Sequence, residues 1–279
     1  MATAKLMGAS VKRREDPRFM TGKGNYVDDL KLPGMTYAAF VRSPHAHAKI
    51  GKIDTAKALK YPGVVAVFTG KDMTGVNSLP CGWDLRKDKN VPGVVQDLAM
   101  VPHMPLSSDV ARHVGDPVAV VIADSQDAAL DAAELVSVQW EPLPSVTVTD
   151  RAGQPGAAQI HAGAPGNIAF KWELGGGDVD AAFKSADVVL SETFTMGRHT
   201  GVTLEARAIL ADFDPSERRL TVYHSFQAPN MMQDILARHL NLPEQDVRVI
   251  CKDVGGSFGI KVHIYPDEMA TCALSVMIG

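Results

Sequence analysis

Cysteine is scarce in this sequence: the 279 residues contain only Cys81, Cys251 and Cys272. These three are widely spaced and odd in number, so they do not resemble a disulfide framework, and we expect a reducing compartment. Three thiols also cannot supply the four thiolates that ligate an iron–sulfur cluster. Any such cluster that serves this protein must therefore lie on another subunit.

The sequence also lacks a basic excess and a hydrophobic run near its start. The formal net charge is −4, and without a stripe of Lys and Arg we expect no nucleic-acid partner. The first twenty residues contain no apolar run, so neither a signal peptide nor a transmembrane helix is expected. Arg13-Arg14 precedes Glu15-Asp16-Pro17 rather than the hydrophobic stretch of a twin-arginine signal. These absences predict a cytoplasmic protein with no membrane partner.

Small residues, glycine and proline interrupt the hydrophobic pattern near the middle of the chain. Residues 150–158 and 162–167 show no periodicity and have the composition of a linker. We therefore predict a domain over 1–150, a linker over 151–168 and a second domain over 169–279. With 46% hydrophobic residues, the chain can bury a substantial core in two such domains.

The first domain is predicted to mix strands and helices. Residues 117–122 are an apolar strand, 125–135 a helix capped by Ser125, and 136–140 a second strand. Residues 36–70 add further strands and a short helix at 56–60. Five residues are the predicted core: Phe40, Val65, Val67, Val118 and Val120.

The second domain is also predicted to be α+β. Asp178 caps a short helix that runs through Phe183, and a strand covers residues 187–194. Residues 208–213 and 220–226 form an antiparallel hairpin across the turn at 214–217. A helix follows Pro229, residues 247–251 form a buried strand, and a last helix begins at Pro266.

Between the last strand and the last helix lies Asp253-Val254-Gly255-Gly256-Ser257-Phe258-Gly259-Ile260-Lys261. Its glycines allow the backbone to approach a ligand closely, and the following helix directs the positive end of its dipole toward the turn. The P-loop signature is absent because Lys261 lies between Ile260 and Val262, and no dinucleotide fingerprint is present. From spacing alone, a cofactor-binding turn and a tight structural turn both remain open.

Gln227 ends the alternating strand that precedes Pro229. The neutral amide side chain of Gln227 thus lies at the end of one predicted strand. Ser257 and Phe258 follow the end of another. Taken alone, Gln227 fits a capping or surface glutamine better than a cofactor contact.

The combination resembles the molybdenum hydroxylase family of xanthine dehydrogenase, aldehyde oxidoreductase and the aerobic carbon monoxide dehydrogenase large subunit. Its marks are Gly-Gly-x-Phe-Gly-x-Lys at 255–261 and the Ser-x-Gln-x-Pro setting of Gln227. Further motifs resemble the family in the same order along the chain, at 13–18, 21–29, 40–48, 62–69, 114–121 and 138–144. The resemblance covers nearly the whole chain but only the N-terminal part of the family's molybdenum subunit.

The resemblance implies an α+β fold, with a hammerhead-type domain followed by the first part of a molybdopterin-binding domain. It implies that Gln227 hydrogen-bonds the oxo group of the molybdenum centre and that the backbone of 256–259 lies against the cofactor. The implied cofactor-binding residues are Gln227, Gly255, Gly256, Ser257, Phe258 and Gly259. Gln227 and Phe258 are expected near the molybdenum, with no direct metal ligand from the protein. No catalytic residue is expected in this chain, because the family's base glutamate lies in the C-terminal part that this chain lacks.

The implied activity is hydroxylation of an electron-poor carbon, in an aldehyde, an N-heteroaromatic ring or a related substrate, with water as the oxygen source. Electrons would pass to 2Fe-2S clusters and FAD on partner subunits, and the molybdopterin would be the cytosine dinucleotide form. Val262 stands where xanthine-specific members carry a substrate-anchoring glutamate, so a purine substrate is not expected. The pattern is closer to the carbon monoxide dehydrogenase-like bacterial group.

Two interpretations of the length follow: a molybdenum subunit split over two genes, or a truncation of a longer protein. Either predicts inactivity of this chain alone and a complementary C-terminal chain as partner, beside the iron–sulfur and FAD subunits. The last helix is rich in Met, Ala, Val and Ile, and we expect another chain to bury it. The alternative function is a catalytically inactive scaffold or assembly subunit that retains the fold.

Other residues permit two interpretations each. His45 and His47 could form a metal pair, but two ligands without a third favour a turn or a subunit contact. Glu205 and Arg207 resemble the family's Glu-Pro-Arg motif, which predicts a structural ion pair of the two rather than catalysis. Lys261 either contacts an anionic cofactor group or is a surface lysine.

Overall fold

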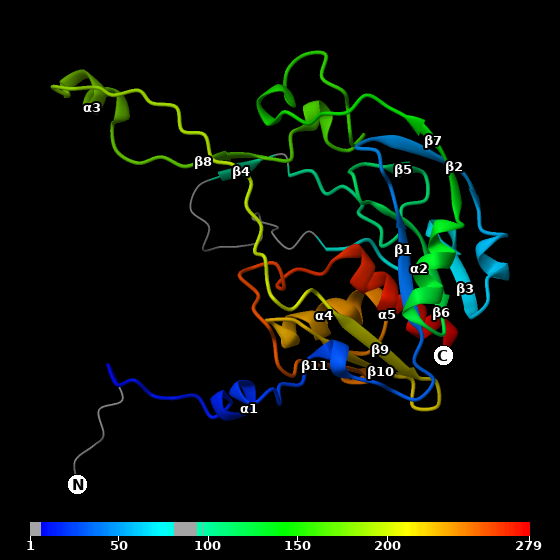
Figure 1. Ribbon diagram of the computed structural model, residues 1–279. Helices are drawn as coiled ribbons and strands as arrows, with labels where there is room; N and C mark the ends of the chain where they lie inside the picture. Colours follow the sequence, from blue (N-terminus) through cyan, green and yellow to red (C-terminus); the bar gives the residue numbers. More distant parts are fainter. Residues whose placement is uncertain (1–6, 81–93, 97) are drawn as a thin grey trace, which may run out of the picture.

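The computed structural model describes residues 7–80, 94–96 and 98–279 (Figure 1). Cys81 lies outside this part of the chain. Three sheets of three strands and one strand pair are present in it. None of the helices described combines the length and the apolar character that crossing a membrane requires.

The central strand of the first sheet is the fully buried β6 (Pro117–Ala123). It pairs antiparallel with β1 (Tyr37–Arg42) on one side and with β3 (Val64–Thr69) on the other. Ser125 caps the helix α2 (Gln126–Glu134) through a bond from the N–H of Ala128, as predicted. Alternate residues of β6 pack on α2 and on the C-terminal helix α5 (Pro266–Ile278). Helices on both faces explain why this strand is apolar throughout.

Most of the predicted core of this region is confirmed, but Val65 is not part of it. Val118 and Val120 are completely buried, whereas Val65 is 55% exposed. The register of β3 against β6 shifts between Val64 and Ala66. Val65 therefore lies in a bulge and points away from the core.

The second sheet has the order β5-β2-β7, with all pairs antiparallel. Its strands are β5 (Val110–Ala111), β2 (Ala48–Asp54) and β7 (Ser137–Pro142). The strand pair joins β4 (Val94–Gln96) to β8 (Lys171–Glu173). The predicted helix at 56–60 is a single 3-10 turn, Ala58–Lys60.

The third sheet carries the segments of functional interest. Its order is β11-β10-β9, from β11 (Val247–Ile250), β10 (Arg219–His224) and β9 (Ile209–Asp214). β9 and β10 form the predicted antiparallel hairpin, whereas β10 and β11 are parallel. A parallel pair needs a crossover, which α4 (Pro229–Leu240) supplies.

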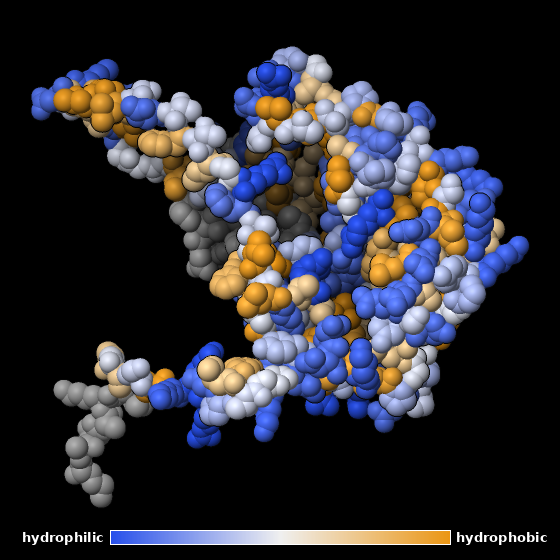
Figure 2. All heavy atoms as spheres, in the orientation of Figure 1, coloured by the Kyte–Doolittle hydropathy of each residue, from blue (hydrophilic) through white to orange (hydrophobic). Residues whose placement is uncertain are grey.

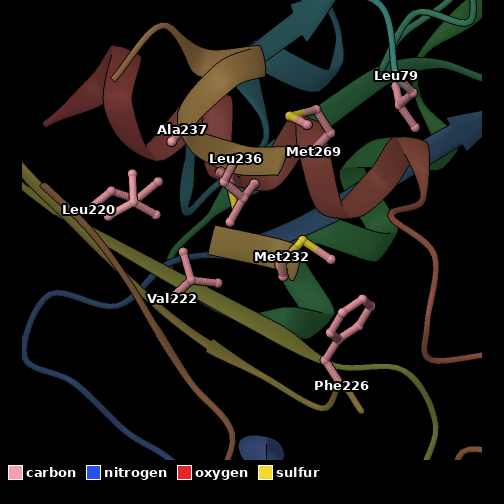
Figure 3. Packing of buried hydrophobic residues seen from close by; sticks show 10 residues of the cluster. Leu79, Leu220, Val222, Phe226, Met232, Leu236, Ala237 and Met269 are labelled. Carbon is pink, nitrogen blue, oxygen red and sulfur yellow. The ribbon is translucent and has the colours of Figure 1, made fainter. Parts of the chain in front are cut away.

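The core of this region lies between the third sheet and the helices α4 and α5. Leu220, Val222 and Phe226 of the sheet side face Met232 and Leu236 of α4 in Figure 3. The other buried members of the cluster are Leu79, Ala237 of α4, Val247 of β11, and Met269 and Cys272 of α5.

The expectation that another chain buries α5 is wrong for most of the helix. Ala270, Ala273 and Leu274 pack on Val120 and Ile122 of β6 within this chain. The helix thus lies between the first and third sheets, and burial of apolar area against both stabilises their contact. Only its end is open, since Met277 and Ile278 are close to half exposed.

The strand predicted over 187–194 is absent from the structure. Asp178 does cap the helix α3 (Val179–Ser185), but this helix projects from the body in Figure 1. Every residue from 168 to 200 is exposed. At the other end of the chain, the short helix α1 (Asp16–Met20) precedes the first sheet.

Candidate functional site

Gln227 and the glycine loop, residues 253–261, meet at one edge of the third sheet. Because β10 and β11 are parallel, their carboxyl ends lie side by side. The backbone N–H of Gln227 donates to the carbonyl of Lys261 at 3.0 Å. The hydroxyl of Ser257, 30 residues further along the chain, donates to Oε1 of Gln227. The structure therefore brings together the two segments that the sequence singled out.

The loop has a left-handed backbone at three positions. The φ angle is +96° at Gly256 and at Gly259, where glycine carries no steric penalty. Phe258 has a φ of +50°, which is uncommon for a residue with a side chain. The residue is 79% exposed. The loop thus presents bare backbone and one aromatic face to its surroundings.

Gly255 permits the loop to lie directly against Glu205. A Cβ atom on Gly255 would overlap the Cβ of Glu205 and would lie 3.2 Å from its backbone nitrogen. A Cβ atom on Gly256 would lie 2.9 Å from the ring of Phe258. Close approach to Glu205 therefore requires glycine at 255, whereas at 256 the φ angle of +96° is the main reason, because the ring of the exposed Phe258 can move aside.

Glu205 connects both ends of the loop with the strand end that bears Gln227. Its Oε2 accepts from the N–H of Gly255 at 2.7 Å, from Nζ of Lys261 at 2.8 Å and from the hydroxyl of Ser225 at 2.6 Å. Burial tends to raise the pKa of Glu205, but the bonds from Lys261, Ser225 and Gly255 outweigh it and leave the pKa lowered. The carboxylate is therefore charged at neutral pH and fixes the loop.

Lys261 is neither a surface lysine nor, in this structure, free to contact a ligand. It is 1% exposed, and Glu205 holds its ammonium group. Arg207 does not pair with Glu205 as the sequence suggested. It binds Asp267 at 3.1 Å and Glu268 at 2.7 Å, at the start of α5.

The amino-terminal segment holds the loop from the other side. Asp253, which begins the loop, accepts two hydrogen bonds from the guanidinium of Arg18. It also accepts from the N–H of Asn25 at 2.7 Å. The bond from Arg18 is the main reason that the pKa of Asp253 is lowered. Residues more than two hundred positions apart thus fix the entry of the loop.

Several donors at this edge have no acceptor within the described part of the chain. They include the backbone N–H groups of residues 256–259. They also include the amide nitrogen of Gln227, whose Oε1 is engaged by Ser257. Clustered outward N–H groups suit a ligand rich in anionic or carbonyl oxygens. The site can therefore bind and orient such a ligand, while its carboxylates, Glu205 and Asp253, hold the loop in place.

His45 and His47 each contact another residue within the described part of the chain. Nδ1 of His47 lies 2.7 Å from the carbonyl oxygen of Pro144, and the ring of His45 contacts Trp140 edge-on. In the part of the chain that the structure describes, no group of three or more His, Cys, Asp or Glu could hold a metal ion. Burial raises the pKa of both Cys251 and Cys272, so neither is an activated thiol.

Two family models match the chain. The model for the a/b hammerhead domain of aldehyde oxidase and xanthine dehydrogenase matches residues 21–144. The model for a molybdopterin cofactor-binding domain matches residues 160–279, which include Gln227 and the whole glycine loop. The two matches follow the order that the sequence motifs predicted.

Curated relatives and solved structures agree with these models. The carbon monoxide dehydrogenase large chain of Afipia carboxidovorans is 37% identical over 98% of this chain and 34% of its own length. The nicotine 6-hydroxylase large subunit of Paenarthrobacter nicotinovorans is 36% identical, over 96% of this chain and 32% of its own. Quinoline 2-oxidoreductase from Pseudomonas putida 86 superposes with a TM-score of 0.81 at 33% identity, over 98% of this chain and 33% of that one. The chain thus spans about a third of the length of these relatives.

Glu205, Arg18 and Asp253 are the site residues whose part sequence reasoning missed. For Glu205 the sequence predicts an ion pair with Arg207, whereas in the structure its partner is Lys261. No local pattern links it to Lys261, because the contact crosses 56 residues and depends on how the third sheet is assembled. The glycine at 255, which leaves no room for another side chain, was the one available signal of a close neighbour.

Proposed function

The chain belongs to the molybdenum hydroxylase family, and from this membership we propose that it forms the molybdopterin-contacting N-terminal part of a molybdenum subunit. The family match covers both the hammerhead region and the start of the cofactor-binding region. As part of the proposal, the hammerhead domain covers 1–150, a linker 151–168, and the cofactor-binding portion 169–279.

The observation that carries the proposal is the junction of Gln227 with the glycine loop. Outward N–H groups of residues 256–259 fit the oxygen-rich pterin and phosphate parts of a molybdopterin. Gln227 would donate its amide to an oxygen at the metal centre, and Phe258 would lie beside that centre. Gly255, Ser257 and the remaining loop residues would shape the backbone against the cofactor.

When bound, the cofactor would supply two-electron oxidation chemistry with water as the oxygen source. This chain's own residues would bind and orient it, while the general base would come from the part of the subunit that the relatives have and this chain does not span. We infer that this chain alone is inactive.

The proposed substrates are aldehydes, N-heteroaromatic compounds or related molecules with an electron-poor carbon. Support for the heteroaromatic class comes from relatives named for nicotine and quinoline. The proposed partners are the remainder of the molybdenum subunit, a 2Fe-2S subunit and an FAD subunit. The proposed form of the cofactor is the cytosine dinucleotide.

Native purification from the source cell, followed by metal analysis and identification of each co-purifying chain, tests this function. We expect molybdenum, iron and flavin together with the rest of a molybdenum subunit. A complex that contains those chains but no molybdenum or pterin would instead support the inactive scaffold.

A further inference from the structure

The segment 174–200 is exposed and rich in apolar residues, and no other part of the chain that the structure describes covers it. Every residue from 168 to 200 is exposed, and Figure 1 shows α3 and its flanking chain extending away from the body. In Figure 2 the projecting segment carries hydrophobic residues along its length. Eight large apolar side chains in this segment are exposed: Leu174, Val179, Phe183, Val188, Val189, Leu190, Phe194 and Met196.

Residues 188–196 have the pattern of a half-buried strand. Val188, Leu190, Phe194 and Met196 fall on one side of an extended chain, with only Glu192 breaking the alternation. Their exposed fractions reach 81% for Leu190, 86% for Phe194 and 88% for Met196. A strand is also what the sequence predicts over residues 187–194.

The backbone N–H groups of residues 187–200 lack hydrogen-bond partners on the backbone within the described part of the chain. In the part of the chain that the structure describes, no strand pairs with residues 187–200, and their N–H groups donate to no backbone carbonyl. Addition to the edge of a sheet would satisfy the N–H and C=O groups and cover the apolar side chains together. A flexible linker would be expected to be polar instead, because a disordered chain lacks large apolar residues.

The comparisons indicate what covers this segment. The alignment with a solved Cu,Mo-CO dehydrogenase includes 98% of this chain but only 34% of that chain, at a TM-score of 0.81. The unaligned 2% is too short to contain residues 168–200. The segment therefore has a counterpart in a polypeptide whose other two thirds have no counterpart here.

We propose that residues 187–196 dock as a strand onto a sheet edge in the remainder of the molybdenum subunit, and that the neighbouring exposed residues Leu174, Val179 and Phe183 pack on it. This inference rests on the proposed function, because it takes its partner from the same subunit. The association depends on apolar side chains and backbone pairing, and not on bound cofactor.

The test is a binding measurement between this chain and the region of the molybdenum subunit that follows its counterpart in the relatives, taken from the source genome. Both are produced in a host that cannot make molybdopterin. Leu190→Asp with Phe194→Asp should weaken association at least about 100-fold, since central apolar anchors dominate interfaces. The matched control, Leu59→Asp with Leu130→Asp, places the same charges on side chains that are 51% and 53% exposed elsewhere, and should stay within about 3-fold of the unmodified chain.

Proline substitutions separate strand addition from simple apolar contact. Successive N–H groups of a strand point to opposite edges, so at least one of Glu192→Pro and Thr193→Pro should remove a ladder bond and weaken binding about 10-fold or more. In hydrogen exchange, the amides of residues 187–196 should be protected in the complex and unprotected in the free chain. Circular dichroism checks that each variant remains folded.

The outcomes distinguish this inference from the proposed function. Unchanged binding by Leu190→Asp with Phe194→Asp overturns the docking surface, even if the native complex contains molybdenum. Concentration-dependent self-association of the free chain that these substitutions abolish also overturns it, since the occupant would then be a second copy. Loss of binding in these variants supports the docking surface even if the native complex proves to be a metal-free scaffold.

Discussion

Nζ of Lys261 lies 2.8 Å from Oε2 of Glu205, and the two side chains are 0% and 12% exposed. The pair is placed where the glycine loop returns to the sheet. Because Glu205 also accepts from Gly255 at the start of the loop, one carboxylate holds both ends of it. Glu205 and Lys261 therefore fix the shape of the loop from its buried side, and they do not cover the N–H groups of residues 256–259.

Glu205→Gln should destabilise the protein by about 3 kcal/mol, because it leaves the ammonium of Lys261 buried without a counter-charge. Urea unfolding monitored by circular dichroism measures the change. The matched control is Glu141→Gln, which removes an ion pair with Lys49 at 2.9 Å whose side chains are 66% and 55% exposed. It should change the free energy of unfolding by less than about 1 kcal/mol. Equal effects of the two substitutions would contradict the assigned role of Glu205.

The contribution of Glu205 should depend on pH in one direction. Its pKa is lowered in the folded protein, so its stabilising effect is complete above the unfolded value of about 4.3 and is lost as the pH falls through the folded value. The difference in unfolding free energy between the unmodified protein and Glu205→Gln should be constant from about pH 6 to 8 and should narrow below about pH 4. A difference that grows on acidification would show that the carboxylate is not the ionised partner of Lys261.

Gly255→Ala should displace the loop, because the added methyl group meets Glu205. We expect a loss of about 1–3 kcal/mol in unfolding free energy, the usual range for overpacking. Gly176→Ala is the control, since nothing lies within 4 Å of a Cβ atom there. An alanine at 255 that leaves stability unchanged would mean that the approach of the loop to Glu205 is looser than described.

Arg207→Ala should reduce the free energy of unfolding more than Arg42→Ala does, although both arginine side chains bind Asp267. Arg207 also neutralises Glu268, whose side chain is 5% exposed. Its loss leaves this buried carboxylate with only the N–H of Tyr265 at 3.0 Å and the imidazole of His224 at 3.3 Å, and should cost about 3 kcal/mol. The side chain of Arg42 is 42% exposed, and its removal should cost about 1 kcal/mol or less. Thermal unfolding of the two variants at the same pH tests the ranking, and a reversed order would refute it.

Local signals in the sequence predicted most elements correctly. Ser125 and Asp178 cap the helices that they were expected to cap, and the hairpin of β9 and β10 lies where turn residues predicted it. The exceptions have tertiary causes. Val65 lies in a bulge that depends on the register with β6, and α5 is covered by a strand of its own chain, about 150 residues earlier.

In the candidate site, too, the local segments could be predicted from the sequence and their tertiary contacts could not. Gln227 and the glycine loop could be located from the sequence because each follows a recognisable strand. Their contact could not, since it depends on β10 and β11 being parallel neighbours. The ion pair of Glu205 with Lys261 could not be predicted either, because a buried ion pair between distant residues produces no periodic pattern in the sequence.

Gln227→Ala addresses the proposed function most directly. If Gln227 has the proposed role, the substitution should lower turnover of the purified native complex about 10-fold or more, because the proposed donor to the metal-centre oxygen is lost, while molybdenum content stays near that of the unmodified enzyme. Gln245→Ala, an exposed glutamine of the same region, is the matched control and should leave turnover unchanged. The fold should tolerate the first substitution, since Gln227 is exposed and the backbone bond from its N–H to Lys261 does not need the side chain. Unchanged turnover in Gln227→Ala, with full molybdenum content, would remove Gln227 from the reaction and leave the glycine loop as the cofactor contact of this chain.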